Sequence, residues 1–248
     1  MTHLPFQHRS ATLQLREFLP GDAADIQILH ADARVRALLT DTHPLQDAAC
    51  ARDFVACLAD FYRRHPGLGI WRCAAQAPTT GPTTGPTTGP TTGPTTGPAA
   101  APAARPAGGC VFAGWFSLMP MHRSRASSQL GVGRDDVELG SRLMPPHWGG
   151  GLALRGGEVL LNHAFTALGL SRVWGVCHPD NRSARACLQA LGFGLRGLAP
   201  YEGQLSQHHA LEAGTWAQVR SLRLRERLRT LRGGASQPLP VAAECGQP

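Results

Sequence analysis

The spacing of apolar residues predicts an alternation of strands and helices along the chain. Residues 13–18 (Leu-Gln-Leu-Arg-Glu-Phe) alternate between apolar and polar side chains, which is typical of a strand with one buried face. The segment from Pro20 to Asp25 then marks a turn and the start of a helix. Apolar residues continue at helical spacing over residues 26–37 and again over residues 54–61. A strand followed by a pair of helices is therefore expected in the first third of the chain.

Two further strands are expected on either side of a low-complexity segment. Residues 69–75 and 110–118 are rich in apolar side chains, and between them Pro-Thr-Thr-Gly occurs five times over residues 78–97. Glycine and proline interrupt regular structure throughout residues 78–108, so we expect a disordered loop inserted in a hairpin. Closing a long loop costs only about 0.6 kcal/mol per doubling of its length. A partner-binding role of the Thr/Pro segment is the alternative.

The second half of the chain contains a glycine turn between a strand and a helix. A strand is predicted at residues 137–143, the turn at 147–153 and a helix at 154–168, followed by a strand at 172–177 and a helix after Asn181. Glycines at such a turn let the backbone approach a ligand closely. The first N–H groups of the helix then favour an anion such as phosphate. The turn is therefore a candidate phosphate site, with an ordinary tight connection as the alternative.

Two common nucleotide-binding motifs do not fit this turn. The phosphate-binding loop of nucleotide hydrolases requires Gly-Lys-Ser/Thr, and this chain contains no lysine. A dinucleotide fingerprint requires Gly-x-Gly-x-x-Gly, which Gly149, Gly151 and Ala153 match poorly. Phosphates would therefore be bound by backbone N–H groups and by arginine. Arg155 and Arg185 are the candidates nearby in sequence.

Two short motifs follow one another in this half of the chain. Residues 148–153 have the form Trp-Gly-x-Gly-x-Ala, and Asn181 begins a helix that closes with Leu-Gly-Phe at 191–193. This combination resembles the GNAT superfamily of N-acetyltransferases, particularly the branch of ribosomal-protein N-terminal acetyltransferases. The resemblance extends over residues 12–77 and 109–218.

The resemblance implies an α/β fold with a mixed, mostly antiparallel central sheet flanked by helices. A single acetyltransferase domain would be formed by residues 1–77 and 109–219. Acetyl-CoA would be the co-substrate, and no metal would be needed. The cofactor contacts implied by the resemblance are Leu143, Trp148, Gly149, Gly150, Gly151, Leu152, Ala153 and Asn181. Asn181 is also a good helix N-cap in its own right.

Acetyl transfer to an amine requires a base, because most of an amine with a pKa near 10 is protonated at pH 7. The resemblance assigns this role to Glu138, on the strand before the glycine turn. Together with Asp135 and Asp136 it would form an acidic mouth that attracts a cationic acceptor. The alternative is a solvated strand end with a salt bridge to Arg134 or Arg142.

The group that would protonate the leaving thiolate is less well defined. The family's tyrosine position is Leu188 here, and the serine position of the ribosomal branch is Ala184. Ser183 is the candidate catalytic residue nearest to that position, although one residue rotates a helical side chain by about 100°. Other substitutes are Cys187, His178 and Tyr201. Proximity of two bound substrates could sustain turnover without an acid, or the chain could bind acetyl-CoA without turnover.

The net charge is +7, and all 24 cationic residues are arginine. Six of them lie at residues 220–232, where Leu224, Leu228 and Leu231 share one helical stripe. A basic helix of this kind predicts contact with the ribosome, nucleic acid or anionic lipid. The alternative is a terminal helix packed by its leucines with a solvated arginine face. Residues 233–248 are expected to be a disordered tail.

The remaining composition favours an intracellular protein. The seven cysteines lie in apolar runs and lack the spacing of metal ligands. The sequence contains no uninterrupted run of 18 apolar residues, so no membrane span is predicted. Together with the resemblance, this composition leads us to expect a cytoplasmic N-acetyltransferase whose acceptor is a primary amine, either a protein N-terminus or a small molecule such as an antibiotic or polyamine. A non-catalytic acetyl-CoA-binding regulator is the competing hypothesis.

Overall fold

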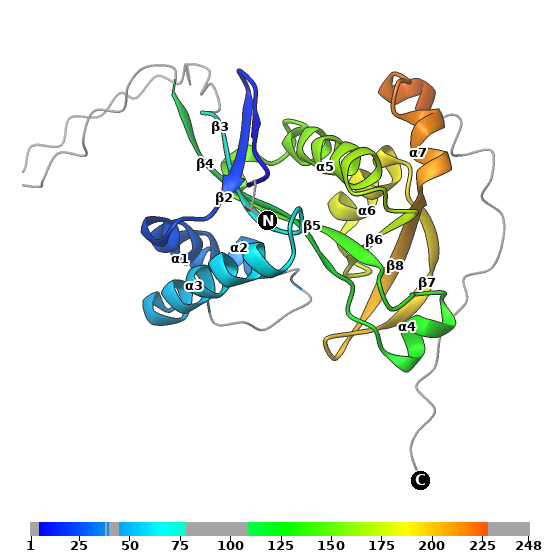
Figure 1. Ribbon diagram of the computed structural model, residues 1–248, viewed down its shortest axis with the longest axis horizontal. Coiled ribbons are helices and arrows are strands. Elements are labelled where there is room, and N and C mark those ends of the chain that lie inside the picture. The colour runs from blue at the N-terminus through cyan, green and yellow to red at the C-terminus, as the bar shows by residue number, and fades with distance from the viewer. Residues whose placement is uncertain (1–4, 38, 40–44, 78–108, 228–248) are drawn as a thin grey trace, which may run out of the picture.

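The computed structural model describes residues 5–37, 39, 45–77 and 109–227 (Figure 1). The expectations for the insertion at 78–108, for residues 228–232 of the basic segment and for the tail at 233–248 concern residues outside the described part.

A mixed sheet forms the centre of the described structure, as predicted (Figure 1). Its strands follow the order β1-β2-β3-β4-β5-β6-β8-β7, and β5 and β6 are the parallel pair among antiparallel neighbours. The strands are β1 (His8–Arg9), β2 (Leu13–Glu17), β3 (Gly69–Gln76), β4 (Cys110–Pro120), β5 (Val137–Leu143), β6 (Arg172–Cys177), β7 (Gly194–Tyr201) and β8 (Gln204–Glu212).

Helices cover both faces of this sheet. On one side lie α1 (Ala23–Ala31), α2 (Ala33–Arg36) and α3 (Ala48–Arg64), and on the other lie α5 (Leu152–Asn162) and α6 (Arg182–Leu191) (Figure 1). The shorter helical elements are η1 (Pro20–Asp22), α4 (Arg125–Gln129), η2 (Pro145–His147), the π-helical η3 (His163–Ala167) and α7 (Ala213–Val219).

Strand periodicity divides the core between the two faces. Trp71 and Phe116 pack with the α5 and α6 side, whereas their neighbours Ile70 and Trp115 pack with α1 and α3. Because successive side chains of a strand point to opposite faces, each strand supplies both cores. The predicted hairpin of β3 and β4 is confirmed. Gln76 and Cys110, which flank the insertion in sequence, are paired with each other.

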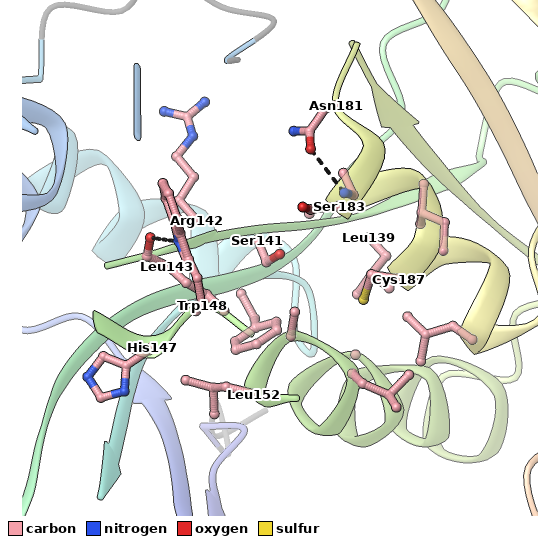
Figure 2. Close-up of a pocket in the computed structure, with 18 of the residues that line it drawn as sticks. Leu139, Ser141, Arg142, Leu143, His147, Trp148, Leu152, Asn181, Ser183 and Cys187 are labelled. Atoms are coloured by element: carbon pink, nitrogen blue, oxygen red, sulfur yellow. Dashed lines mark hydrogen bonds between the residues drawn. The ribbon is translucent and has the colours of Figure 1, made fainter. Parts of the chain in front are cut away.

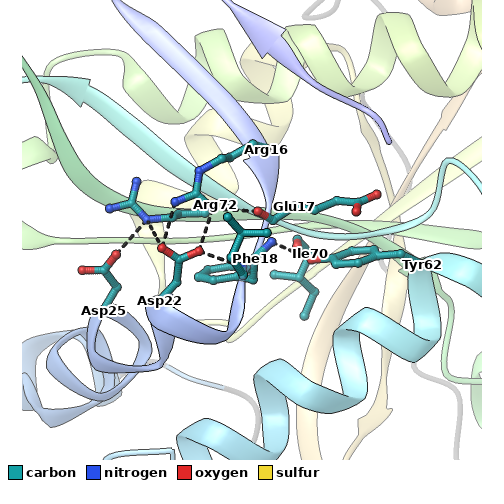
Figure 3. Close-up of polar contacts among 9 residues, drawn as sticks. Arg16, Glu17, Phe18, Asp22, Asp25, Tyr62, Ile70 and Arg72 are labelled. Carbon is teal, nitrogen blue, oxygen red and sulfur yellow. Dashed lines mark hydrogen bonds and ion pairs between the residues drawn. The ribbon is translucent and has the colours of Figure 1, made fainter. Parts of the chain in front are cut away.

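Ion pairs fasten the first helices to the edge of the sheet (Figure 3). Arg16 of β2 makes a two-pronged contact with Asp22, with N···O distances of 2.6 and 2.8 Å. Arg72 of β3 donates to Asp25 at 2.7 Å. Fork-shaped guanidinium contacts fix orientation as well as distance, so these pairs set where α1 begins relative to the strands.

Tyr62 of α3 adds a second connection between helix and sheet (Figure 3). Its hydroxyl accepts a hydrogen bond from the Phe18 N–H at 3.2 Å and donates to the Ile70 carbonyl. Both partners belong to the chain near β2 and β3, so α3 is held across two strands.

The parallel strands β5 and β6 stay together for only a short distance. Val137 pairs with Val173 and Glu138 with Trp174, and no further pair joins these strands. Beyond Glu138, β5 continues to pair with β4 as far as Leu143 paired with Gly114. The side of β5 that faces β6 is therefore an open strand edge over residues 139–143.

Candidate functional site

A cavity of about 480 Å³ lies at this opening of the sheet (Figure 2). Its walls are residues 139–143 of β5, the glycine turn with the first turn of α5, and one side of α6. Arg34, Val35 and Leu39 close it from the direction of α2. The cavity therefore connects elements from both faces of the sheet.

The expected cofactor-binding residues come together at this cavity, although they derive from three elements. All of them except Gly150 line it: Leu143, Trp148, Gly149, Gly151, Leu152, Ala153 and Asn181. Gly150 lies within the same turn. Ser183 also lines the cavity, whereas Glu138 does not.

Backbone geometry explains the glycines of the turn. Gly149 and Gly151 have φ angles of +76° and +73°, in the left-handed region that favours glycine. Gly150 does not have a positive φ, and a Cβ added to it would meet no atom within 4 Å, so nothing in the fold requires glycine there. The left-handed Gly151 starts α5 at Leu152, two residues before the predicted start.

Two side chains hold the turn in place. The Trp148 indole N–H donates to the Leu143 carbonyl at 2.8 Å, which ties the turn to the end of β5 (Figure 2). Arg155 donates to the Gly150 carbonyl at 3.0 Å. Gly151 provides no side-chain cap, so the first N–H groups of α5 are not bonded by a capping side chain. This arrangement can bind an anion.

Of the two arginines expected near the phosphates, the structure places one at the turn. Arg155 contacts the glycine turn directly. The charge of Arg185 instead lowers the pKa values of Cys177 in β6 and His209 in β8, so Arg185 lies toward these strands. Of these two arginines, Arg155 is therefore the one that lies at the N-terminus of α5.

The helix α6 presents a mixed polar and apolar side to the cavity (Figure 2). Asn181 is its N-cap, with Oδ1 accepting the Ala184 N–H at 3.0 Å. Ser183 and Cys187 lie one helical turn apart and both line the cavity, as does Leu188. Burial raises the pKa of the Cys187 thiol to about 11, so this thiol is protonated at neutral pH.

Glu138 lies on the opposite face of β5 from its neighbour Leu139. Its Oε2 accepts a hydrogen bond from the Tyr201 hydroxyl at 2.7 Å. This contact takes the place of the salt bridge to Arg134 or Arg142 that the sequence allowed. Burial raises the pKa of Glu138 to about 7, although the hydrogen bond from Tyr201 opposes that change. A carboxyl group with this pKa can take up a proton near neutral pH.

The expected acidic mouth is not formed as predicted. Asp136 turns inward, where its Oδ2 accepts hydrogen bonds from the Trp174 indole at 2.6 Å and from the Gly133 N–H at 2.8 Å. Its carboxylate is thus used to satisfy a buried indole donor. Asp135 is exposed, and Glu138 is engaged by Tyr201.

The other candidate acids are separated by the fold. Tyr201 is directed to Glu138, and His178 accepts a hydrogen bond from the Asp180 N–H at 3.2 Å; neither lines the cavity. Ser183 and Cys187 remain at the cavity. Ser141, Arg142 and His147 also line the cavity, and none of them was among the expected cofactor contacts, since nothing in their local pattern marks them as such.

Two kinds of site are not found in the part of the chain that the structure describes. Its His, Cys, Asp and Glu side chains form no group of three or more that could hold a metal ion. Its helices include none with the length and apolar character needed to span a bilayer.

Comparison with known proteins identifies relatives of this arrangement. A family model described as "Acetyltransferase (GNAT) domain" matches residues 12–194. FsC-acetyl coenzyme A-N(2)-transacetylase of Aspergillus fumigatus is 32% identical over 81 residues, which cover 33% of this chain and 34% of that protein. The chain spans about a third of the length of the curated relatives it matches.

Two solved structures have the same fold at low identity. Ribosomal-protein-S5-alanine acetyltransferase from Vibrio fischeri has a TM-score of 0.58 and 15% identity, covering 85% of this chain and 98% of its own. Mycobacterium smegmatis RimJ in complex with CoA-disulfide has a TM-score of 0.56 and 17% identity, covering 91% and 92%.

Proposed function

The chain belongs to the GNAT family of acetyltransferases, and from this premise we propose that it transfers the acetyl group of acetyl-CoA to a primary amine. One observation carries the proposal. The open edge of β5, the uncapped N-terminus of α5 and the N-terminal half of α6 meet at a single cavity. The β5 edge offers unpaired backbone groups, the N-terminus of α5 offers an anion site, and α6 offers polar side chains, so one extended molecule could contact all three.

Acetyl-CoA would match these groups with its pyrophosphate at the glycine turn and its pantetheine arm along β5. It supplies an acetyl thioester, two amides in its pantetheine arm and a pyrophosphate. The N–H groups at residues 149–153 would bind the pyrophosphate, assisted by Arg155. The open edge of β5 would pair with the amides of the arm, as a neighbouring strand would. Asn181 lines the same cavity from the other side.

Glu138 would act as the base for the acceptor amine. Its pKa of about 7 leaves about half of the carboxyl groups ionised at neutral pH. Since Glu138 and Leu139 point to opposite faces of β5, the amine would approach from the face that carries α1 and α2, and the thioester from the cavity side. Glu138 would take the amine proton directly or through a water molecule.

Ser183 is proposed to donate a hydrogen bond to the departing thiolate. An ordinary cysteine thiol ionises at about pH 8.5, and the thiol of coenzyme A is likewise an unburied alkyl thiol. Cys187, whose pKa is about 11, is a weaker acid than this thiol, so complete proton transfer from Cys187 would be uphill. A hydrogen bond from Ser183 with final protonation by solvent meets the requirement.

The acceptor proposed first is a protein N-terminal amine. The structural relatives named as ribosomal-protein-S5-alanine acetyltransferase and RimJ support this choice. A small-molecule amine is the second candidate, and a non-catalytic acetyl-CoA-binding regulator is the third. We place this activity in the cytoplasm, where the free thiols expected from the cysteine pattern would persist.

Calorimetric titration with acetyl-CoA and desulfo-CoA tests the cofactor, and thiol release with a panel of amines and N-terminal peptides tests turnover. We expect both nucleotides to bind and at least one amine class to release thiol. Glu138→Gln should retain binding, because Glu138 does not line the cavity, and should lose about 10²-fold or more in turnover. If neither nucleotide binds, the proposal is wrong; binding without thiol release would favour the regulator.

A further inference from the structure

The hairpin between β7 and β8 has an unusual turn. Tyr201 pairs with Gln204, so Glu202 and Gly203 form a two-residue turn, with φ angles of +48° and +83°. Positive φ at both positions is typical of a type I′ turn, in which Asn-Gly is common. Glu202 is the non-glycine residue with positive φ among the described residues. Such a conformation persists only where the surrounding structure enforces it.

The turn holds Tyr201 against the β5 strand. The Tyr201 hydroxyl donates to Glu138 Oε2 at 2.7 Å across 63 residues of sequence. Its ring makes edge contacts with the rings of His122 and His208, with centroid distances of 5.9 and 6.2 Å. Burial raises the pKa of Tyr201, so the phenol is a permanent donor over the physiological range. The tyrosine is thus held by two ring contacts and by the hydrogen bond of its hydroxyl.

We propose that Tyr201 is a positioning residue that aims the Glu138 carboxylate at the acceptor amine; this inference rests on the proposed function. A carboxylate on a glutamate side chain can rotate about its terminal bond. The bond to Oε2 stops that rotation and leaves Oε1 as the oxygen for the amine proton. The β7–β8 hairpin therefore becomes part of the acceptor side of the site, although neither Tyr201 nor Glu202 lines the cavity.

The groups around Glu138 determine whether its pKa rises or falls. Tyr201 and Glu202 act on Glu138 directly. The rings of His122 and His208 lie against Tyr201, and Arg142, further along β5, interacts with Tyr201 and Glu202. The Tyr201 hydrogen bond lowers the pKa of Glu138, because it favours the ionised carboxylate. The Glu202 carboxylate raises that pKa, because like charges repel. Removing the Tyr201 hydroxyl should thus raise the pKa of Glu138, and removing the Glu202 carboxylate should lower it.

Tyr201→Phe tests the proposal, since it removes the hydroxyl and retains the ring. We expect the acidic limb of the kcat/KM profile to move to higher pH by about one unit, since a hydrogen bond to the charged form is lost. Turnover at pH 7 should fall about tenfold while the KM for acetyl-CoA is unchanged. A carboxyl-carbon NMR titration of glutamate-labelled protein, with Glu138 assigned from Glu138→Gln, should show the same rise of its pKa.

Glu202→Gly is the matched variant at the same turn. It relieves the positive φ and removes the like charge, so the NMR titration should show a lower pKa for Glu138 and the acidic limb should move to lower pH. Unchanged titration and unchanged pH profiles in Tyr201→Phe would overturn the proposal. Failure of the proposed function is seen separately, as absence of acetyl-CoA binding in the wild-type protein, and the NMR titration still reports the Tyr201–Glu138 contact in that case.

Discussion

Asn181 can serve the helix and a ligand at the same time, because its amide has an acceptor and a donor. The acceptor Oδ1 caps α6 through the Ala184 N–H, and this leaves the two N–H bonds of Nδ2 for another partner. The sequence analysis gave Asn181 both of these roles, as a helix N-cap and as a cofactor contact. The structure separates the two uses, since the cap takes the oxygen and the residue lines the cavity.

Replacing Asn181 with Ser or Ala separates capping from binding. Serine caps a helix about as well as asparagine, whereas alanine loses the cap at a cost of about 1 kcal/mol. Both are too short to donate into the cavity. We expect acetyl-CoA affinity to fall by a similar factor, about tenfold, in both variants, and the free energy of unfolding to fall only in Asn181→Ala. Calorimetry and urea unfolding measure the two effects; unchanged affinity in both would show that Asn181 is a cap and nothing more.

Glu138 should reduce stability at high pH. Its pKa is raised from 4.5 to about 7, so below pH 4.5 the carboxyl group is protonated in both the folded and unfolded states. Between pH 4.5 and 7 the unfolded chain ionises while the folded protein retains the proton, so the free energy of unfolding falls as pH rises. Glu138→Gln removes this loss and should raise stability at pH 8 by about 1–2 kcal/mol, after allowing for solvent screening of a partly exposed group.

Urea unfolding of the wild type and Glu138→Gln at pH 4.5 and pH 8 measures this difference. We expect the two curves to coincide more closely at pH 4.5, because the Tyr201 hydroxyl can donate to the amide oxygen as well as to the acid. A variant that is less stable than the wild type at pH 8 would mean that Glu138 is not under electrostatic strain. A base that is costly to ionise is common at functional sites.

At the scale of elements, close packing of α5 on the sheet explains two glycines inside a helix. A Cβ at Gly156 would lie 2.1 Å from the Phe116 ring, and one at Gly157 would lie 2.7 Å from a Leu191 methyl. Glycine inside a helix costs about 1 kcal/mol relative to alanine. The approach of α5 to β4 and α6 therefore outweighs helix propensity at these positions.

Gly156→Ala should destabilise the protein by about 1–3 kcal/mol in spite of its better helix propensity, because the Phe116 ring is rigid and buried. Gly214→Ala is the matched control within α7, where a Cβ meets nothing within 4 Å. It should be neutral or stabilising by up to about 1 kcal/mol. Thermal unfolding of both variants measures the contrast. Equal effects of the two substitutions would contradict a packing role for Gly156.

The same elements show what the sequence could and could not predict. Strands, the glycine turn and the cap at Asn181 were predictable because each depends on side chains close in sequence. The contact of Tyr201 with Glu138 was not, since it depends on the register of β7 and β8. Asp136 was wrongly assigned to an acidic mouth because its partner, Trp174, lies 38 residues away on the neighbouring strand.

At the scale of the whole molecule, Arg227 joins the end of the described chain to the two helices of the cavity. It is 4% exposed and donates to Glu158 of α5 at 2.9 Å and to the Ala190 carbonyl of α6 at 3.2 Å. Its guanidinium also lies 5.6 Å from the Trp216 ring centroid. A cation is favoured there because the last carbonyls of α6 carry partial negative charge.

Arg227 and Leu224 depart from the expected pattern of the basic segment, whereas Arg220, Arg223 and Arg225 are exposed, as a solvated arginine face requires. A solvated arginine face packed down by leucines was the structural alternative, but Leu224 is 44% exposed whereas Arg227 is buried. The reason is that Glu158 and the end of α6 provide acceptors that leucine cannot use. Contact of residues 220–232 with the ribosome or nucleic acid remains a prediction, and Arg227 is not available for it.

Arg227→Ala should lower the free energy of unfolding by about 2 kcal/mol, because it removes the donors of buried carbonyls and leaves the partly exposed Glu158 without its ion-pair partner. Arg225→Ala changes the net charge equally at an exposed position and should cost less than about 0.5 kcal/mol. Urea unfolding compares the two variants. If they were equally destabilised, net charge rather than the buried contact would be responsible. Because α5 and α6 both line the cavity, Arg227→Ala should also weaken acetyl-CoA binding, whereas Arg225→Ala should leave it unchanged.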